Sequence, residues 1–142
     1  NKGVGALKDA STKINLAFNC KVAGSSALDS VVTAAKNAVD ENNATPWIGG
    51  KYAEEWLTLD LGAVKSFNEI QVFPEFPIKA YQYKIEVSED NKTWKLADDQ
   101  WENKNIGSPL ITKSKFDTRY IHITMRNEIN NTRPGLWEVK IY

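Results

Sequence analysis

Short runs of alternating apolar and polar residues dominate the chain, and they predict β-strands. Between residues 80 and 88, large apolar side chains occupy every second position from Tyr81 to Val87, with polar residues between them. Successive side chains of a strand point to opposite faces, so this segment has one apolar and one polar face. The pattern therefore predicts a strand that buries one face in a core.

Further strands follow the same alternation between turn-forming residues. We expect them at residues 56–61, 67–73, 93–97, 110–113, 119–125 and 136–142. Short turns at 62–65 and 89–92 join neighbouring strands. Only residues 29–40, rich in alanine and valine, favour a helix, which we place at 34–38. One short helix among many strands predicts an all-β fold, an antiparallel β-sandwich of two sheets.

Strand direction predicts that the long loops gather at one end of this sandwich. Antiparallel neighbours alternate in direction, so alternate connections lie at the same end. The loops 48–55, 74–79, 98–108 and 126–135 fall at one end, and the short turns fall at the other. Long loops on a rigid scaffold usually carry function, so we expect a binding site there.

The four long loops contain the side chains that sugar recognition needs. Planar rings stack on the face of a pyranose, and forked polar groups bind its hydroxyls. The candidate rings are Tyr52, Phe76 and Trp101. The candidate polar contacts are Glu54, Glu75, Lys79, Arg126, Asn130 and Arg133. The remaining tryptophans, at positions 47, 56, 94 and 137, are expected to be structural.

Charge and composition narrow the class of partner. Lys plus Arg number 18 and Asp plus Glu number 18, so the chain lacks the basic excess of a nucleic-acid binder or a polybasic membrane binder. Cys20 is the sole cysteine, which excludes an internal disulfide. With 42% hydrophobic residues, residues 1–142 are expected to form a single domain. The sequence begins with Asn1 and not with methionine, so we expect that domain to be a fragment of a larger protein.

The residues expected of an enzyme are missing from the sequence. His122 is the single histidine and falls on the polar face of its strand. A histidine base needs an orienting partner and a nucleophile in reach, and the chain carries no nucleophile elbow, phosphate loop or zinc-ligand cluster. We therefore predict a non-catalytic module.

Seven segments, in order along the chain, carry a resemblance to a known family. They are residues 15–23, 38–47, 56–62, 83–88, Trp94, 119–121 and 136–142. In these segments the chain resembles the discoidin domain, or coagulation factor V/VIII type C domain, and most of all the bacterial family 32 carbohydrate-binding modules. The resemblance implies a galactose-binding-like jelly roll that holds an attached glycoside hydrolase near its glycan. It also implies a secreted, periplasmic or cell-surface bacterial protein whose partners are a glycan and the other domains of its parent polypeptide.

The same resemblance implies a structural Ca²⁺ near the loop end. The matching positions are Asn37, Asp40, Asn42, Thr45, Trp137 and Glu138. They would offer the mixture of carboxylate, carbonyl and hydroxyl oxygens that Ca²⁺ takes. The sequence departs from the family at Glu41, where the usual Gly permits a positive φ. The alternative is that Asp40 and Thr45 only shape a turn.

A second departure concerns the choice of ligand. Glu75 follows Pro74 in a short loop, where galactose-binding relatives tend to have a longer loop and an Arg. A carboxylate accepts from hydroxyl or amino groups and repels acidic sugars, so galactose recognition of the usual type is not expected. Two other functions stay open. One is a protein-interaction or scaffold module without its own glycan site. The other is a phospholipid binder, for which Phe76 is the one strong apolar candidate among the loop residues.

Overall fold

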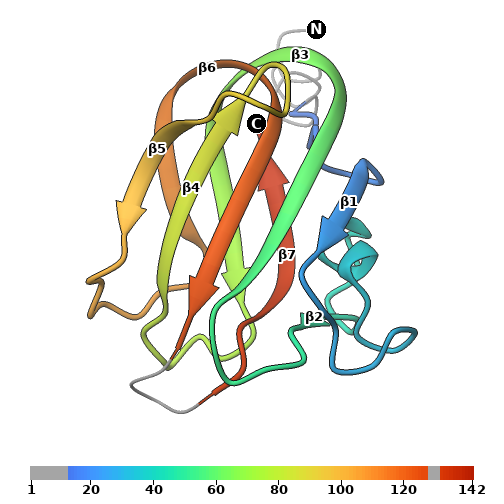
Figure 1. The fold of residues 1–142 in the computed structure, drawn as a ribbon, viewed down its shortest axis with the longest axis vertical. Coiled ribbons are helices and arrows are strands. Elements are labelled where there is room, and N and C mark those ends of the chain that lie inside the picture. The colour runs from blue at the N-terminus through green and yellow to red at the C-terminus, as the bar shows by residue number, and fades with distance from the viewer. Residues whose placement is uncertain (1–12, 128–131) are drawn as a thin grey trace, which may run out of the picture.

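The computed structural model describes residues 13–127 and 132–142, and antiparallel strands make up most of this part of the chain. The strands form two facing layers, which confirms the predicted β-sandwich (Figure 1). In chain order the elements are β1 (Lys21–Gly24), the 3₁₀ helix η1 (Ala35–Val39), β2 (Trp47–Ile48), β3 (Glu55–Pro74), β4 (Gln82–Ser88), β5 (Lys95–Gln100), β6 (Leu110–Arg126) and β7 (Gly135–Ile141).

Two long strands, β3 and β6, belong to both layers. The first half of β3 pairs with β1 and with the second half of β6, and its second half pairs with β7 and with the first half of β6. Both strands bend over an arch at the top of Figure 1. At this arch the pairing shifts register, and Gly62 adopts a φ of 86° that favours glycine.

The continuity of these strands corrects the sequence prediction. We expected separate strands at 56–61 and 67–73 with a turn at 62–65, and separate strands at 110–113 and 119–125. The structure joins each pair into one long strand, β3 and β6. These two strands bend together and stay paired with each other on both sides of the arch. The predicted helix at 34–38 is confirmed as η1, whereas β1 and β2 are too short to carry a sequence signal.

The predicted apolar faces form the core between the layers. The alternating residues from Tyr81 to Val87 are buried, as are Leu57 and Leu59 of β3. The predicted face of β7 is only partly correct. Val139 and Ile141 are fully buried, but a register shift in the pairing of β3 with β7 displaces the half-buried Trp137.

Within the part of the chain that the structure describes, no helix has the length and apolar character needed to cross a membrane.

Candidate functional site

The long loops between the strands meet at one end of the sandwich, at the bottom of Figure 1. Gly49 N donates to Pro134 O at 2.8 Å, which ties the loop before β3 to the segment before β7. Lys79 Nζ donates to Thr132 Oγ1 at 2.9 Å, which joins the loop after β3 to the same segment. The predicted gathering of loops is therefore present, and we call this end the rim.

A cavity of about 260 Å³ opens on the rim. It is lined by Leu28, Ile48, Tyr52, Glu75, Phe76, Lys79, Thr132 and Arg133. We call it the rim cavity. It brings together Tyr52, Glu75, Phe76, Lys79 and Arg133, which were proposed from the sequence as sugar contacts.

Two exposed rings stand in the rim cavity, and each carries a cation on its surface. Tyr52 is 53% exposed, with the Arg133 guanidinium carbon 4.1 Å from its ring centre. Arg133 Nη1 also donates to Tyr52 Oη at 2.7 Å. Phe76 is 37% exposed, with Lys79 Nζ 4.6 Å from its ring centre. Each cation fixes its ring in place and leaves part of the ring open to a ligand.

Glu75 places a carboxylate between these groups. Its main chain is held on both sides, because Glu75 N donates to Gly135 O and Trp137 Nε1 donates to Glu75 O, both at 2.9 Å. Burial raises the pKa of the Glu75 carboxyl group, and the charges of Lys79 and Arg133 oppose that rise. Gly135 leaves room for this side chain, since a Cβ at that position would lie 3.1 Å from Glu75 Oε1, a tight contact.

The rim cavity also contains unused hydrogen-bonding capacity. Arg133 Nε is buried and has no hydrogen-bond partner among the described residues. A buried donor without a partner is costly, so such groups often mark a place where a ligand or water binds. The cavity thus combines a guanidinium group, a carboxylate acceptor and two rings.

Other proposed sugar contacts lie elsewhere. Arg126 packs against Trp101, with its guanidinium carbon 4.2 Å from the ring centre and Nη2 donating to Trp101 O at 3.1 Å. Lys84 Nζ lies 4.9 Å from the same ring, so the half-buried Trp101 is held by two cations and does not line the rim cavity. Glu54 is exposed and does not line it either. Asn130 falls outside the described residues.

Sequence reasoning did not include Leu28, Ile48 and Thr132, although they line the rim cavity. The buried carboxylate of Glu55 binds the two serines before Leu28 and so holds this segment at the rim. Glu55 accepts a hydrogen bond from Ser26 Oγ at 2.6 Å and another from Ser25 Oγ, and Leu28 N donates to Ile48 O at 2.8 Å. The single signal for this packing in the sequence is the pair of serines, and a serine pair indicates no particular partner.

The loop after η1 contains the residues proposed to bind Ca²⁺. Thr45 Oγ1 donates to Asp40 Oδ2 at 2.5 Å, and Asn42 N donates to Asp40 Oδ1 at 2.9 Å. Glu41 has a φ of 55°, so the loop adopts the positive φ that a Gly would favour despite the larger side chain. Asn15 Nδ2 donates to Glu41 Oε1 at 3.1 Å and helps to hold this conformation.

Glu138 of β7 lies against this loop, next to Asp40. It is 1% exposed, and neither carboxylate oxygen has a hydrogen-bond partner among the described residues. Burial and then the neighbouring Asp40 raise the pKa of Glu138 to about 8, and the main-chain N–H groups of Glu41 and Asn42 act in the opposite direction. Two neighbouring carboxyl groups, one of them fully buried, fit a site built for a cation.

The rest of the proposed set is compatible with that fit. Asn37 uses its side-chain amide to donate to Val32 O and Pro46 O, so its main-chain carbonyl would be the donor atom, as the resemblance implies. Among the described residues, no three His, Cys, Asp or Glu side chains lie close enough together to hold a metal ion by themselves. An ion held here would therefore depend on carbonyl and hydroxyl oxygens as well as on the two carboxylates.

His122 lies on the outer face of its sheet, as predicted. Its ring is 5.2 Å from the Trp56 ring and 5.5 Å from the Trp94 ring, and its Nδ1 is 2.7 Å from Thr58 Oγ1. Burial by these neighbours lowers the pKa of His122.

The fold is that of a jelly-roll β-sandwich with its long loops gathered at one end. Residues 21–139 match the family model described as the F5/8 type C domain, so the chain belongs to that family. The resemblance inferred from the sequence motifs is thereby confirmed.

One curated protein matches part of this chain. A curated relative, the polysaccharide lyase 8 family protein HylA of Enterococcus faecalis, is 36% identical over 84 residues; the match covers 58% of this chain and 6% of the relative. The chain therefore matches only a small part of that relative's length.

Solved structures share the fold over nearly the whole chain. The module CpGH89CBM32-6 from Clostridium perfringens is 26% identical, with a TM-score of 0.77 over 91% of this chain and 98% of the module. Chitosan-binding module 2 of a chitosanase/glucanase from Paenibacillus sp. IK-5, solved with chitotriose, is 24% identical, with a TM-score of 0.76 over 90% and 99% of the two chains.

Proposed function

We propose that this domain is a non-catalytic carbohydrate-binding module that takes a sugar in the rim cavity. The observation that supports this most is the convergence of two exposed rings, one carboxylate and one guanidinium group in a single opening. Sugars present both an apolar ring face and a dense set of hydroxyls, and this set of groups matches both.

In this proposal each group has its own task. Tyr52 and Phe76 form apolar surfaces for the sugar ring, Glu75 accepts from two neighbouring hydroxyls, and the Arg133 guanidinium group donates to a ring or hydroxyl oxygen. The chitotriose complex of the Paenibacillus module supports an oligosaccharide as ligand. Affinity for one sugar is expected to be weak, with a Kd on the order of 10 µM to 1 mM, because little surface is buried.

We further propose that Asp40, Thr45 and Glu138 bind Ca²⁺ together with carbonyl oxygens of Asn37, Asn42 and Trp137. The bound ion would neutralise the two carboxylates and link the loop after η1 to β7. Its role would be structural, since the rim cavity does not include these residues.

The parent protein is proposed to be a secreted or surface enzyme that acts on polysaccharides. The match to one small part of a much longer polysaccharide lyase relative supports this, because it is the relation expected of an accessory domain. The module would keep the enzyme close to its substrate and raise the local concentration of glycan.

A glycan array followed by calorimetry tests the proposal. Phe76→Ala and Tyr52→Ala should each weaken binding of the array ligand about tenfold, which corresponds to about 1.4 kcal/mol. Phe18→Ala is the matched control, since Phe18 is 49% exposed and does not line the rim cavity. Trp101→Ala should have a smaller effect. If no glycan binds, or if Phe18→Ala weakens binding as much as Phe76→Ala, the proposal is wrong.

A further inference from the structure

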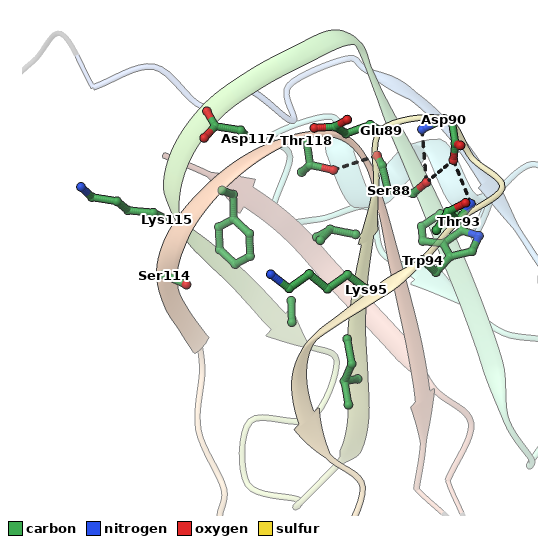
Figure 2. Close-up of a pocket in the computed structure, with 14 residues that line it drawn as sticks. Ser88, Glu89, Asp90, Thr93, Trp94, Lys95, Ser114, Lys115, Asp117 and Thr118 are labelled. Atoms are coloured by element: carbon green, nitrogen blue, oxygen red, sulfur yellow. Dashed lines mark hydrogen bonds between the residues drawn. The ribbon is translucent and has the colours of Figure 1, made fainter.

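A second and larger cavity, of about 470 Å³, lies at the end of the sandwich opposite the rim. It opens between the β4–β5 hairpin and the arch of β6 (Figure 2). Its lining runs from Val87 to Asp90, from Thr93 to Ala97 and from Ser114 to Thr118. We call it the arch cavity.

Two open strand edges form its walls. β5 ends the sheet and pairs only with β4, and β6 has no partner in β4 before Tyr120. The pairing of β6 with β3 also shifts register beside Ser114 and Lys115, between Lys113 and Phe116. Along these edges main-chain N–H and C=O groups lack a strand partner, and such groups can bind hydroxyl groups of a ligand.

The floor of the arch cavity is apolar. Phe116 is 7% exposed and stacks on Phe67 with ring centres 5.0 Å apart, and Val87 is 9% exposed. Ala97 lies beside them in the lining. This floor is bordered by polar walls, which favours an amphipathic ligand over a purely apolar one.

Two lysines, Lys95 and Lys115, line the arch cavity, and Lys95 is the one that reaches across it. Lys95 pairs across the ladder with the buried Val87, so its side chain is on the inward face of β5. Figure 2 shows it reaching from β5 toward the arch of β6. Among the described residues, the Lys95 side chain forms no hydrogen bond, ion pair or ring contact.

The acidic residues of the lining do not neutralise Lys95. Asp90 accepts from Lys92 N and Thr93 N at 2.9 and 2.8 Å and so shapes the turn, and Asp117 accepts from Ser66 Oγ. Glu89 is exposed and lies with Asp117 at the outer end of the cavity, near the top of Figure 2. In Figure 2 Lys95 lies in the middle of the opening, whereas these three carboxyl groups lie away from its middle.

We propose that the arch cavity is a second binding site, which takes a sugar acid of the uronate class. Lys95 Nζ binds the carboxylate, the sugar ring lies on the floor of Phe116 and Ala97, and Ser114 with the open strand edges binds the hydroxyls. This site does not depend on the rim cavity. A module with both sites contacts glycan at two opposite ends.

Two-dimensional NMR of the amide groups, with D-glucuronate as probe, tests this. Glucuronate should shift the amides of residues 95–97 and 114–118, with a Kd on the order of 1 mM. Lys95→Gln should weaken binding about tenfold, and Lys95→Arg should retain it, because a charge-assisted hydrogen bond is lost in the first variant only. Lys92→Gln is the matched control, since Lys92 is on the same hairpin, is exposed and does not line the cavity.

Three further measurements distinguish uronate binding in the arch cavity from binding at the rim and from nonspecific binding. D-glucose should bind at least tenfold more weakly than glucuronate, because it lacks the carboxylate. Phe76→Ala should leave the glucuronate shifts unchanged, since it removes a rim ring. Benzoate should bind more weakly than glucuronate, because it cannot use the polar walls. Shifts confined to the rim, equal effects of Lys95→Gln and Lys92→Gln, or equal binding of benzoate or glucose would each overturn the proposal.

Discussion

Glu138→Gln should have opposite effects on stability with and without Ca²⁺. The glutamine keeps the shape of the side chain but removes the charge that lies buried against Asp40. Without the ion, wild-type protein must keep this carboxyl group protonated or bury an unpaired charge, and the variant avoids both. With the ion, the wild-type carboxylate becomes a ligand and the variant loses it.

The size of the effect follows from the pKa of Glu138, which is raised from 4.5 to about 8. The folded state binds the proton more tightly than the unfolded state, so stability is unaffected below 4.5 and decreases as the pH rises toward 8. The loss is about 1.4 kcal/mol per pH unit, or about 3 kcal/mol at neutral pH. A buried amide costs about 1–3 kcal/mol at any pH, so the advantage of the variant should grow with pH.

Calcium should reverse this order. Ligand that binds only the folded state at a hundred times its Kd adds about 2.7 kcal/mol to the stability of the wild type and little to that of the variant. The assay is urea unfolding followed by tryptophan fluorescence at several pH values between 5 and 8, in EDTA and in Ca²⁺. Glu54→Gln, which changes an exposed glutamate, is the control.

Two results would refute the reasoning. If the stability difference between wild type and Glu138→Gln in EDTA does not change with pH, the carboxyl group is not the buried acid described above. If Ca²⁺ stabilises wild type and Glu138→Gln equally, Glu138 is not a ligand.

Three other substitutions follow from local geometry. Glu41→Gly should raise the free energy of unfolding by up to about 1 kcal/mol, because glycine accepts the positive φ of 55° without strain; a loss in urea unfolding would contradict this. Since burial lowers the pKa of His122, stability should decrease as the pH falls below about 6.5, and His122→Gln should remove that part of the pH dependence; identical pH profiles would show otherwise. Gly135→Ala should cost about 1–3 kcal/mol in thermal unfolding, because its Cβ would lie 3.1 Å from Glu75 Oε1 and from Trp47 O, and an unchanged melting temperature would exclude the clash.

The sequence predicts the strands and the rim for a physical reason. Alternation fixes which face of a strand is buried, and the antiparallel order fixes which loops share an end. Tyr52 and Arg133 are 81 positions apart, yet strand direction alone places them at one end, where they form a hydrogen bond.

Other features depend on contacts that no local pattern encodes. The arch that joins the two halves of β3 forms because β6 bends with it. The residues of β3 at the arch are exposed, and in the sequence such a polar interruption of the alternation predicts a turn. Trp101 looked like a free stacking ring because its neighbours in the sequence are polar. Arg126 and Lys84, which cover it, come from other strands. The unpaired charge of Glu138 is likewise invisible in the sequence, where a strand glutamate is usually solvated.

The loop after η1 and the rim cavity share one structural support, and this predicts that the proposed Ca²⁺ and the proposed glycan are coupled. Trp137 Nε1 holds the main chain of Glu75, and the next residue, Glu138, contacts the loop after η1, so the irregular part of β7 contacts both. Removing Ca²⁺ leaves the Glu138 carboxyl group without a partner and loosens the segment that positions Glu75. We therefore expect EDTA to weaken glycan binding at the rim about fivefold. Linkage requires that the glycan then raises the affinity for Ca²⁺ by the same factor, so Ca²⁺ titrations with and without glycan measure the coupling twice. Equal Ca²⁺ affinities in the two titrations would mean that Trp137 holds Glu75 independently of the ion.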